Sequence, residues 1–307
     1  MSPTKRDLVL GYNHGYSWPK LAPFFNSLRA TGFAGDISLF TSGVEPGALM
    51  EIRAHGVLTL ESPCRDMTSR TKTSPLWKYL RFAPAGLHPW LLRNISEIAT
   101  LRHFLYEQHL AQNLSRYRQV LLTDVRDVAF QTNPFAAPLE PGVQVFEEDG
   151  RHSLATRPIN AAWIRESFGL ATLQELGHLP ILCAGTLLGE TAAVSAFLGH
   201  LCRTFARARS VRSAGIDQGI FNVAARTWQD PRLHFQKNGA AAVLTMGNMN
   251  HADVLVDPSG WVRRANGEVI PVLHQFDRHP GLCQKIKVLQ EHDWLCAWGK
   301  SPQMVPA

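Results

Sequence analysis

The chain has 307 residues and a formal net charge of +6. Hydrophobic residues make up 45% of it and charged residues 18%, a globular composition that excludes a disordered or fibrous protein. The excess of positive charge favours an anionic partner, which is a nucleic acid, a membrane surface or a phosphorylated small molecule.

The cysteines and the N-terminal residues indicate the compartment. The five cysteines are scattered and form no C-x-x-C pair, which excludes a zinc knuckle or a thioredoxin-type motif. Free thiols are typical of a reducing compartment. The first residues lead directly into an apolar run and show no signal-peptide pattern. We therefore expect a cytoplasmic protein.

The first sixty residues alternate between apolar runs and segments of helical period. We expect strands at 7–13, 36–41 and 56–60, a helix that begins after Ser17 and ends before Gly32, and a second helix at 45–55. This β-α-β-α-β order predicts a parallel sheet with helices on its faces.

Residues 62–90 break that pattern with several prolines and many basic residues. They predict a long connection with at most a short helix near 77–82, and loops of this length are usually functional. Lys72 within it is a candidate phosphate ligand. A helix at 95–114 and a strand at 120–123 follow.

Shorter elements fill the rest of the chain. We expect strands at 144–146, 181–188, 243–245, 254–256 and 269–274, and helices at 191–207, 217–227 and 281–290. The apolar stretch 181–202 contains glycines and Glu190, so it predicts a strand and a buried helix rather than a membrane span. With no repeat and no clear linker, one domain with two lobes is expected.

Two acidic residues directly follow the predicted strand 120–123. Asp124 and Asp127 lie where ligands bind in open α/β sheets, outside the carboxyl ends of the strands. Carboxylate oxygens are suitable ligands for a hard divalent cation. The alternative is that one of the two caps a turn or pairs with Arg126. Common dinucleotide, P-loop, metalloprotease and hydrolase motifs are absent.

The segment D-V-R-D-V-A-F-Q-T-N-P-F at 124–135 resembles the D-x-D segment of GT-A glycosyltransferases, most closely the nucleotide-diphospho-sugar transferases. Three later segments agree in order: C-A-G-T-L-L-G at 183–189, D-Q-G-I-F-N at 217–222 and H-Q-F-D-R at 274–278. The spacing here is D-x-x-D. Counted back from Pro134, Asp127 takes the place of the second family aspartate, which leaves Asp124 either a ribose contact or a water-mediated metal contact.

The resemblance implies a fold and an activity. The fold is α/β, a Rossmann-like mixed sheet flanked by helices in a single GT-A domain over 1–307, with a nucleotide-binding lobe at 1–127 and an acceptor-binding lobe at 128–307. The activity is metal-dependent transfer of a sugar from a nucleotide-diphosphate sugar to a saccharide, lipid-linked or protein acceptor.

The resemblance also implies a metal site of Asp124, Asp127 and His274. An imidazole ligand favours Mn²⁺, with Mg²⁺ as the alternative. A cation held there bridges the phosphate oxygens and stabilises the leaving diphosphate. For His274, the alternative is a hydrogen-bonded core histidine.

Further site residues follow from the same resemblance. Asp217 and Gln218 would face the sugar as candidate catalytic residues, although a plain helix cap remains the alternative for Asp217. Gly185 and Thr186 would let the donor approach the strand closely.

Nucleotide contacts are expected at the end of the first strand and on the helix before the metal strand. Asn13 and His14 lie where the base and ribose would bind, with a polar turn as the alternative. Arg102 is a candidate phosphate ligand, with a surface salt bridge as the alternative.

Partners and rival functions stay open at this point. No nucleic-acid-binding motif is present, so no nucleic acid is expected. The arginines at 203–212 leave peripheral contact with a membrane or a lipid-phosphate acceptor open. The acidic run 147–149 is expected to be an exposed turn. The rival functions are a metal-dependent phosphohydrolase and a degenerate, non-catalytic nucleotide-sugar-binding protein.

Overall fold

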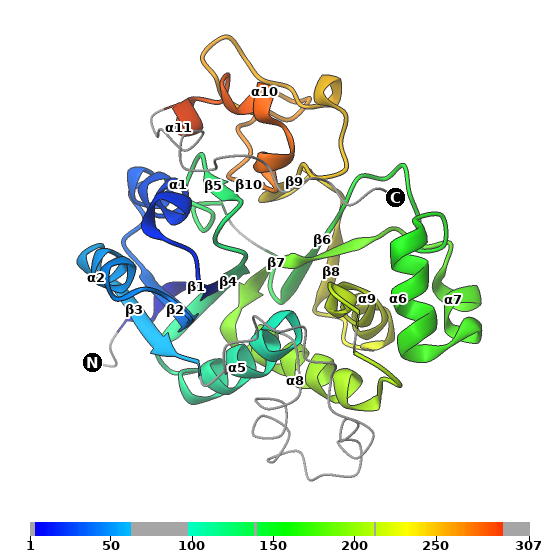
Figure 1. The fold of residues 1–307 in the computed structure, drawn as a ribbon. Coiled ribbons are helices and arrows are strands. Elements are labelled where there is room, and N and C mark those ends of the chain that lie inside the picture. The colour runs from blue at the N-terminus through cyan, green and yellow to red at the C-terminus, as the bar shows by residue number, and fades with distance from the viewer. Residues whose placement is uncertain (1–3, 63–97, 138–139, 212, 291–307) are drawn as a thin grey trace.

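The structure of the protein is a computed structural model that describes residues 4–62, 98–137, 140–211 and 213–290. Its centre is a seven-stranded sheet with the order β3-β2-β1-β4-β7-β6-β8 (Figure 1). The strands are β1 Arg6–His14, β2 Asp36–Ser42, β3 Val57–Glu61, β4 Tyr117–Thr123, β6 Val143–Glu147, β7 Leu182–Glu190 and β8 Leu233–Gln236.

The direction of each strand decides which residues meet at one edge. Strands β1 to β4 are parallel, β7 runs antiparallel to both β4 and β6, and β6 is parallel to β8. The carboxyl ends of β1, β4 and β6 therefore lie at the same edge as the beginning of β7. The change of direction in strand order between β1 and β4 creates a crevice at this edge, where α/β proteins bind ligands.

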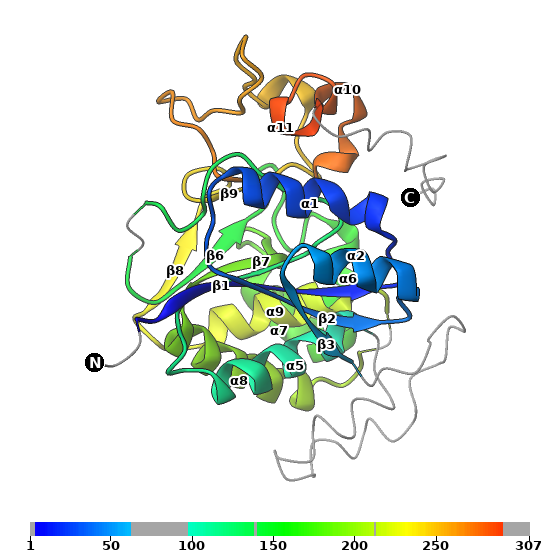
Figure 2. The ribbon, with the colours of Figure 1, turned by 90° about the vertical axis from the view of Figure 1, so that its left-hand side faces the viewer.

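Helices cover both faces of the sheet (Figure 2). The helices α1 Trp18–Ala30 and α2 Pro46–Ala54 lie on one face, while α5 Ile98–Gln112, α8 Thr191–Arg207 and α9 Ile216–Thr227 lie on the other. Each face has its own apolar core: Phe24, Phe25 and Phe130 are fully buried on the first, and Phe197, Phe205 and Phe221 on the second.

A three-stranded sheet with the order β5-β10-β9 lies over the edge described above. Its strands are β5 Val128–Phe130, β9 Val243–Thr245 and β10 Val272–His274, and β10 pairs antiparallel with β5 and parallel with β9. Short helices α10 Pro280–Cys283 and α11 Lys287–Gln290 pack over it around a third apolar core. This small sheet brings residue 274 back to the segment that follows β4.

Most of the predicted elements are confirmed. The alternating first sixty residues form β1, α1, β2, α2 and β3, and Gly32 follows α1 in a left-handed conformation with φ of 77°. The predicted strand and helix within 181–207 are β7 and α8, so that apolar stretch belongs to the core. The sheet is mixed because β7 is reversed.

Some expectations are wrong. No strand forms at 254–256; the chain makes a 3-10 turn at His251–Asp253, and Val256 makes a single bridge with Val262. The predicted helix at 281–290 is two four-residue helices. The pattern also failed to predict β5, β8 and the helices α6 Pro158–Phe168 and α7 Leu170–Leu176. The suggested short helix near 77–82 lies outside the described residues.

Candidate metal centre

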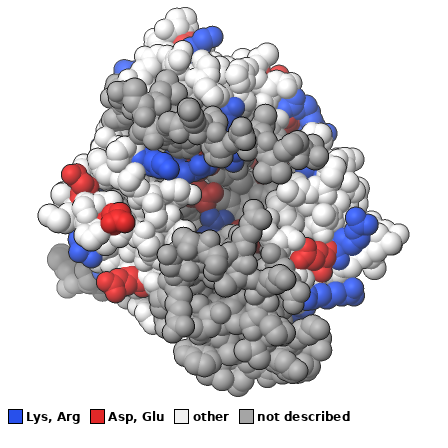
Figure 3. Space-filling view, viewed as in Figure 1, with Lys and Arg blue, Asp and Glu red and all other residues white. Residues whose placement is uncertain are grey.

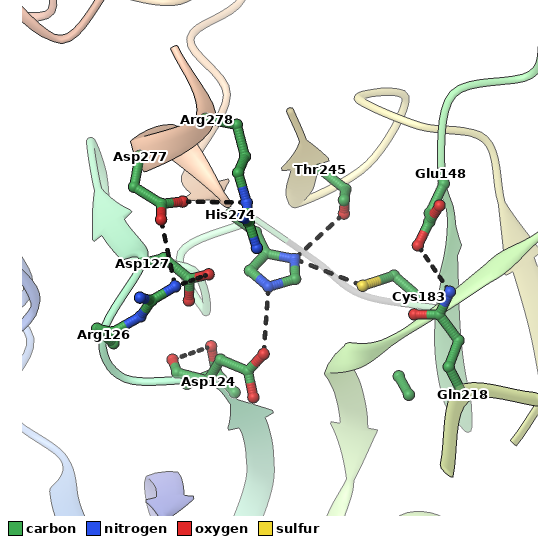
Figure 4. Close-up of polar contacts among 12 residues, drawn as sticks. Asp124, Arg126, Asp127, Glu148, Cys183, Gln218, Thr245, His274, Asp277 and Arg278 are labelled. Atoms are coloured by element: carbon green, nitrogen blue, oxygen red, sulfur yellow. Dashed lines mark hydrogen bonds and ion pairs between the residues drawn. The ribbon is translucent and has the colours of Figure 1, made fainter. Parts of the chain in front are cut away.

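The side chains of Asp124, Asp127 and His274 form a cluster whose ligand atoms all lie within 4.8 Å of one another (Figure 4). We call these three residues the metal cluster. Asp124 follows the last residue of β4, Asp127 precedes β5, and His274 is the last residue of β10. Two carboxylates and one imidazole are a donor set that can hold a metal ion.

The backbone fixes how these three residues face one another. The amide of Asp124 donates to the carbonyl of Gly185 at 2.8 Å, and the amide of Gln275 donates to the carbonyl of Asp127 at 2.7 Å. Gln275 has a φ of 57°, the one positive value outside glycine among the described residues. A left-handed residue of this kind is strained and is often found next to functional sites. It ends β10 directly after His274.

Gly185 provides the space in which Asp124 and His274 meet. A methyl group at this position would lie 2.6 Å from Asp124 Oδ2, 2.6 Å from His274 Cε1 and 2.8 Å from His274 Nε2. Such distances are far below van der Waals contact, so no side chain fits here. From the sequence, Gly185 was expected to let a substrate approach the strand closely. In the structure, two candidate metal ligands, Asp124 and His274, approach it closely.

His274 is fully buried, and its two ring nitrogens face different surroundings. Nε2 lies 3.4 Å from Asp124 Oδ2, makes no hydrogen bond with a described residue and is directed into the metal cluster. Nδ1 lies 3.5 Å from Cys183 Sγ and 3.4 Å from Thr245 Oγ1. A buried imidazole nitrogen without a hydrogen-bond partner needs an explanation, and this one lies among carboxylate oxygens with which it could share a metal ion.

Electrostatic interactions shift the pKa values of two members of the cluster, Asp124 and His274. Burial acts to raise the pKa of Asp124, but Arg102 and His274 outweigh it and hold that pKa well below its usual value. Burial acts to lower the pKa of His274, but the neighbouring Cys183 and Asp124 raise it above its usual value. Only a deprotonated nitrogen ligates a metal, so a cation bound here would displace any proton from Nε2.

A third acidic side chain, Asp277, lies beside the metal cluster. Arg126 Nη2 lies 3.4 Å from Asp127 Oδ2 and 3.2 Å from Asp277 Oδ2, and so links these two carboxylates. The Asp277 side chain is only 5% exposed, and burial together with Asp127 raises its pKa. The predicted pairing of Arg126 with one of the aspartates is thus present, and it leaves Asp124 to other partners.

Arg102 connects the metal cluster to the predicted catalytic carboxylate. Its guanidinium contacts Asp124 Oδ1 and lies 3.1 Å from Asp217 Oδ2. Asp217 is in the first turn of α9, where Gly215 occupies the cap position, so Asp217 is not a plain helix cap. Burial acts to raise the pKa of Asp217, but His103 and Arg102 lower it overall. Arg102 was predicted to bind phosphate, and in this structure its charge faces two carboxylates instead of solvent.

Gln218 is held by a group that the sequence did not single out. Its Nε2 donates to Glu148 Oε1 at 3.0 Å and to Asn160 Oδ1 at 3.3 Å, while Asn248 Nδ2 donates to Glu148 Oε2 at 2.7 Å. We call Glu148, Gln218 and Asn248 the carboxamide cluster. Figure 4 shows Gln218 beside Cys183, on the side of His274 away from Asp127.

The expectation that residues 147–149 form an exposed turn is therefore wrong for Glu148, which is 5% exposed. Its amide donates to the carbonyl of Ile181 at 2.8 Å, which draws the residue against β7 beyond the last residue of β6. Burial raises the pKa of Glu148, while Gln218 and Asn248 oppose that shift. A carboxylate directly after a strand was the signal that identified Asp124, and it would have identified Glu148 as well.

The remaining predicted residues lie along the same edge. The Asn13 amide closes a local turn, accepting from the Tyr16 backbone N–H at 3.0 Å and donating to its carbonyl at 3.3 Å. His14 Nδ1 lies 2.8 Å from Ser42 Oγ. Thr186 is buried, and its hydroxyl has no hydrogen-bond partner among the described residues. Lys72 lies outside the described residues.

The surface around this edge carries charges of both signs. Figure 3 shows basic and acidic side chains side by side next to a hollow near the middle of the face seen in Figure 1. Arg203, Arg207 and Arg209 of the predicted basic cluster are exposed. None of the helices that the structure describes is both long and apolar enough to cross a membrane.

The comparisons with known proteins give no family for this chain. Its sequence matches no protein-family model and no curated protein. The function of this chain is therefore inferred from the geometry of the site itself.

Proposed function

We propose that this protein is a metal-dependent glycosyltransferase of the GT-A type, which moves a sugar from a nucleotide-diphosphate sugar to an acceptor. The observation that carries the proposal is the metal cluster at the carboxyl end of β4, linked through Arg102 to Asp217. A candidate cation site and a candidate sugar-binding carboxylate are thus held by one arginine at the crevice between β1 and β4.

The donor set supports a bound Mn²⁺ or Mg²⁺. Asp124 has one oxygen on Arg102 and the other facing His274 Nε2, so it can hold a cation without giving up its ion pair. A cation bound by Asp124, Asp127 and His274 supplies positive charge to the diphosphate that leaves. Arg126 and Arg278, which both contact Asp277, add further positive charge beside the cluster.

The roles of the other residues follow from their place beside the metal cluster. Asp217 is ionised and fixed by Arg102 and His103, which suits it to accept hydrogen bonds from sugar hydroxyls. Gln218 has its amide nitrogen engaged by Glu148 and Asn160, which orients its carbonyl oxygen as an acceptor towards the sugar. That oxygen can stabilise positive charge that develops at the anomeric carbon.

A thermal-shift experiment tests this proposal. The protein is heated with UDP, GDP, ADP or CMP, each with and without Mn²⁺, and we expect one nucleotide diphosphate to stabilise it only when Mn²⁺ is present. Asp127→Ala should abolish the metal-dependent part of the stabilisation, whereas Asp253→Ala, at an exposed acidic residue, should not.

Four other outcomes separate the proposed function from its rivals. No stabilisation by any nucleotide contradicts the proposal. Release of phosphate from a nucleotide, with no dependence on an attached sugar, indicates a metal-dependent phosphohydrolase. Metal-dependent nucleotide binding without turnover of any nucleotide sugar indicates a degenerate binding protein, and hydrolysis of a nucleotide sugar in the absence of acceptor indicates a working transferase.

A further inference from the structure

We propose that Cys183 and Thr245 are positioning residues that orient the His274 ring, so that Nε2 presents its lone pair to the metal cluster. This inference depends on the metal site of the proposed function, and it assigns a role to two residues that do not themselves ligate the cation.

His274 Nδ1 contacts two side chains that can hold the ring in place. The thiol of Cys183 on β7 lies 3.5 Å from this nitrogen, and the hydroxyl of Thr245 on β9 lies 3.4 Å from it. Both groups can accept a hydrogen bond from a ring N–H. When Nδ1 carries the hydrogen, Nε2 is the nitrogen with the free lone pair, and metal-bound histidines are generally held in this way by a group behind the ring.

These two contacts come from different parts of the fold. Thr245 is paired with His274 in the small sheet, and Cys183 belongs to the seven-stranded sheet (Figure 4). The ring is therefore held between two sheets by one polar contact from each. Because His274 and Cys183 are at most 1% exposed, water does not compete for these contacts.

Cys183 lies on the wrong side of the His274 ring to be a metal ligand. The carboxylates of Asp124 and Asp127 gather with Nε2, whereas the thiol contacts Nδ1 across the ring. Cys183 is not one of the residues that share the 4.8 Å cluster. A cysteine in this place acts on the cation only through His274.

Mn²⁺ titration calorimetry of the full chain tests this assignment. We expect Cys183→Ala and Thr245→Val each to weaken Mn²⁺ binding about 10-fold, and the double variant to weaken it by up to about 100-fold. Cys183→Ser keeps an acceptor and should bind within about 3-fold of the unaltered protein. Cys202→Ala, which removes a buried thiol from α8, is the matched control for the loss of a core sulfur.

A second measurement reads the ring directly and needs no metal. In a long-range ¹H–¹⁵N spectrum of protein labelled at histidine, recorded at a pH at which the His274 ring is neutral and with His274 assigned from its loss in His274→Asn, the Nδ1–H tautomer should dominate. Cys183→Ala and Thr245→Val should shift His274 towards the other tautomer, while Cys202→Ala should leave it unchanged.

Three results would overturn the assignment. The first is a double variant that binds Mn²⁺ as well as Cys202→Ala does. The second is a Cys183→Ala variant that loses much more affinity for Cd²⁺ than for Mn²⁺, because that pattern indicates direct thiolate ligation. The third is an unchanged tautomer in both single variants. Failure of the unaltered protein to bind Mn²⁺ would instead contradict the proposed function, and the spectrum would still decide the role of the two residues.

Discussion

The metal cluster and the carboxamide cluster lie at the same edge of the seven-stranded sheet, but their polar atoms are satisfied to different degrees. Both oxygens of Glu148 accept hydrogen bonds, one from Gln218 and one from Asn248. In the metal cluster, Nε2 of the buried His274 has no hydrogen-bond partner among the described residues.

This difference suggests a structural role for the Glu148 contacts and a ligand-binding role for the metal cluster. Leaving a buried polar group unsatisfied costs about 1–3 kcal/mol, so a cation that bound His274 Nε2 would remove that cost. The Glu148 carboxylate is satisfied without a ligand, and it fixes the amide nitrogen of Gln218. The metal cluster is incomplete, and it has both the donor types and the spacing that a divalent cation requires.

Removal of the arginine that joins Asp124 to Asp217 should have the largest effect. Arg102→Ala leaves two carboxylates without their shared cation, and loss of one partner from a buried ion pair costs about 3–5 kcal/mol. We expect the free energy of unfolding, measured by urea denaturation, to fall by that amount.

Arg116→Ala is the control for this change, since Arg116 is exposed and pairs with Asp36 at 2.7 Å. Exposed pairs contribute at most about 1 kcal/mol. If both variants lose equal stability, Arg102 does not stabilise the buried Asp217 and the part-buried Asp124 in the way described above.

Filling the space between Asp124 and His274 should affect the metal cluster and spare the carboxamide cluster. Gly185→Ala places a methyl group 2.6 Å from both side chains. We expect a loss of about 1–3 kcal/mol in unfolding free energy from overpacking, and Mn²⁺ binding at least about 10-fold weaker by calorimetry.

Gly199→Ala is the matched control because its methyl group would meet only the end of Arg203 at 3.5 Å, within α8. Replacing a glycine inside a helix by alanine stabilises a protein by up to about 1 kcal/mol. A Gly185→Ala variant that binds Mn²⁺ normally would show that this glycine does not make room for the cluster.

The smallest of these effects is expected in the carboxamide cluster. Glu148→Gln keeps the shape of the side chain but sets its amide N–H₂ group against one of the two donors, Gln218 Nε2 or Asn248 Nδ2, and keeps an acceptor for the other. We expect a loss of about 1–2 kcal/mol in unfolding free energy and unchanged Mn²⁺ affinity. Turnover of the nucleotide sugar should fall, because the Gln218 amide loses its fixed orientation. A variant with normal stability and weaker Mn²⁺ binding would place Glu148 with the metal ligands.

The two clusters also differ in how far the sequence predicts them. All three residues of the metal cluster were named from the sequence, Asp124 and Asp127 because they follow a clear apolar strand and His274 because of the resemblance, and the structure brings them together. The approach of His274 to Asp124 was not predictable from local pattern, since it depends on the pairing of β10 with β5 across more than a hundred residues.

Glu148 shows why part of the site was missed. From the sequence alone, an acidic run is expected to form a solvent-exposed turn. The hydrogen bond from the Glu148 amide to the Ile181 carbonyl joins segments that are distant in the sequence, so no local pattern predicts that Glu148 is buried. The fold shows the same division. The strongly alternating first sixty residues were predicted correctly, whereas the three-residue strand β5 and the helices α6 and α7 lacked a periodic signal of sufficient length.

The proposed metal site is tested most directly by a crystal structure of the protein with Mn²⁺ and the nucleotide diphosphate that stabilises it. Anomalous scattering data recorded for the metal would locate the cation. We predict one strong anomalous peak at about 2.0–2.3 Å from oxygen atoms of Asp124 and Asp127 and from Nε2 of His274. Phosphate oxygens of the nucleotide should complete the coordination. A peak at another place, or a nucleotide bound away from the crevice between β1 and β4, would contradict this prediction.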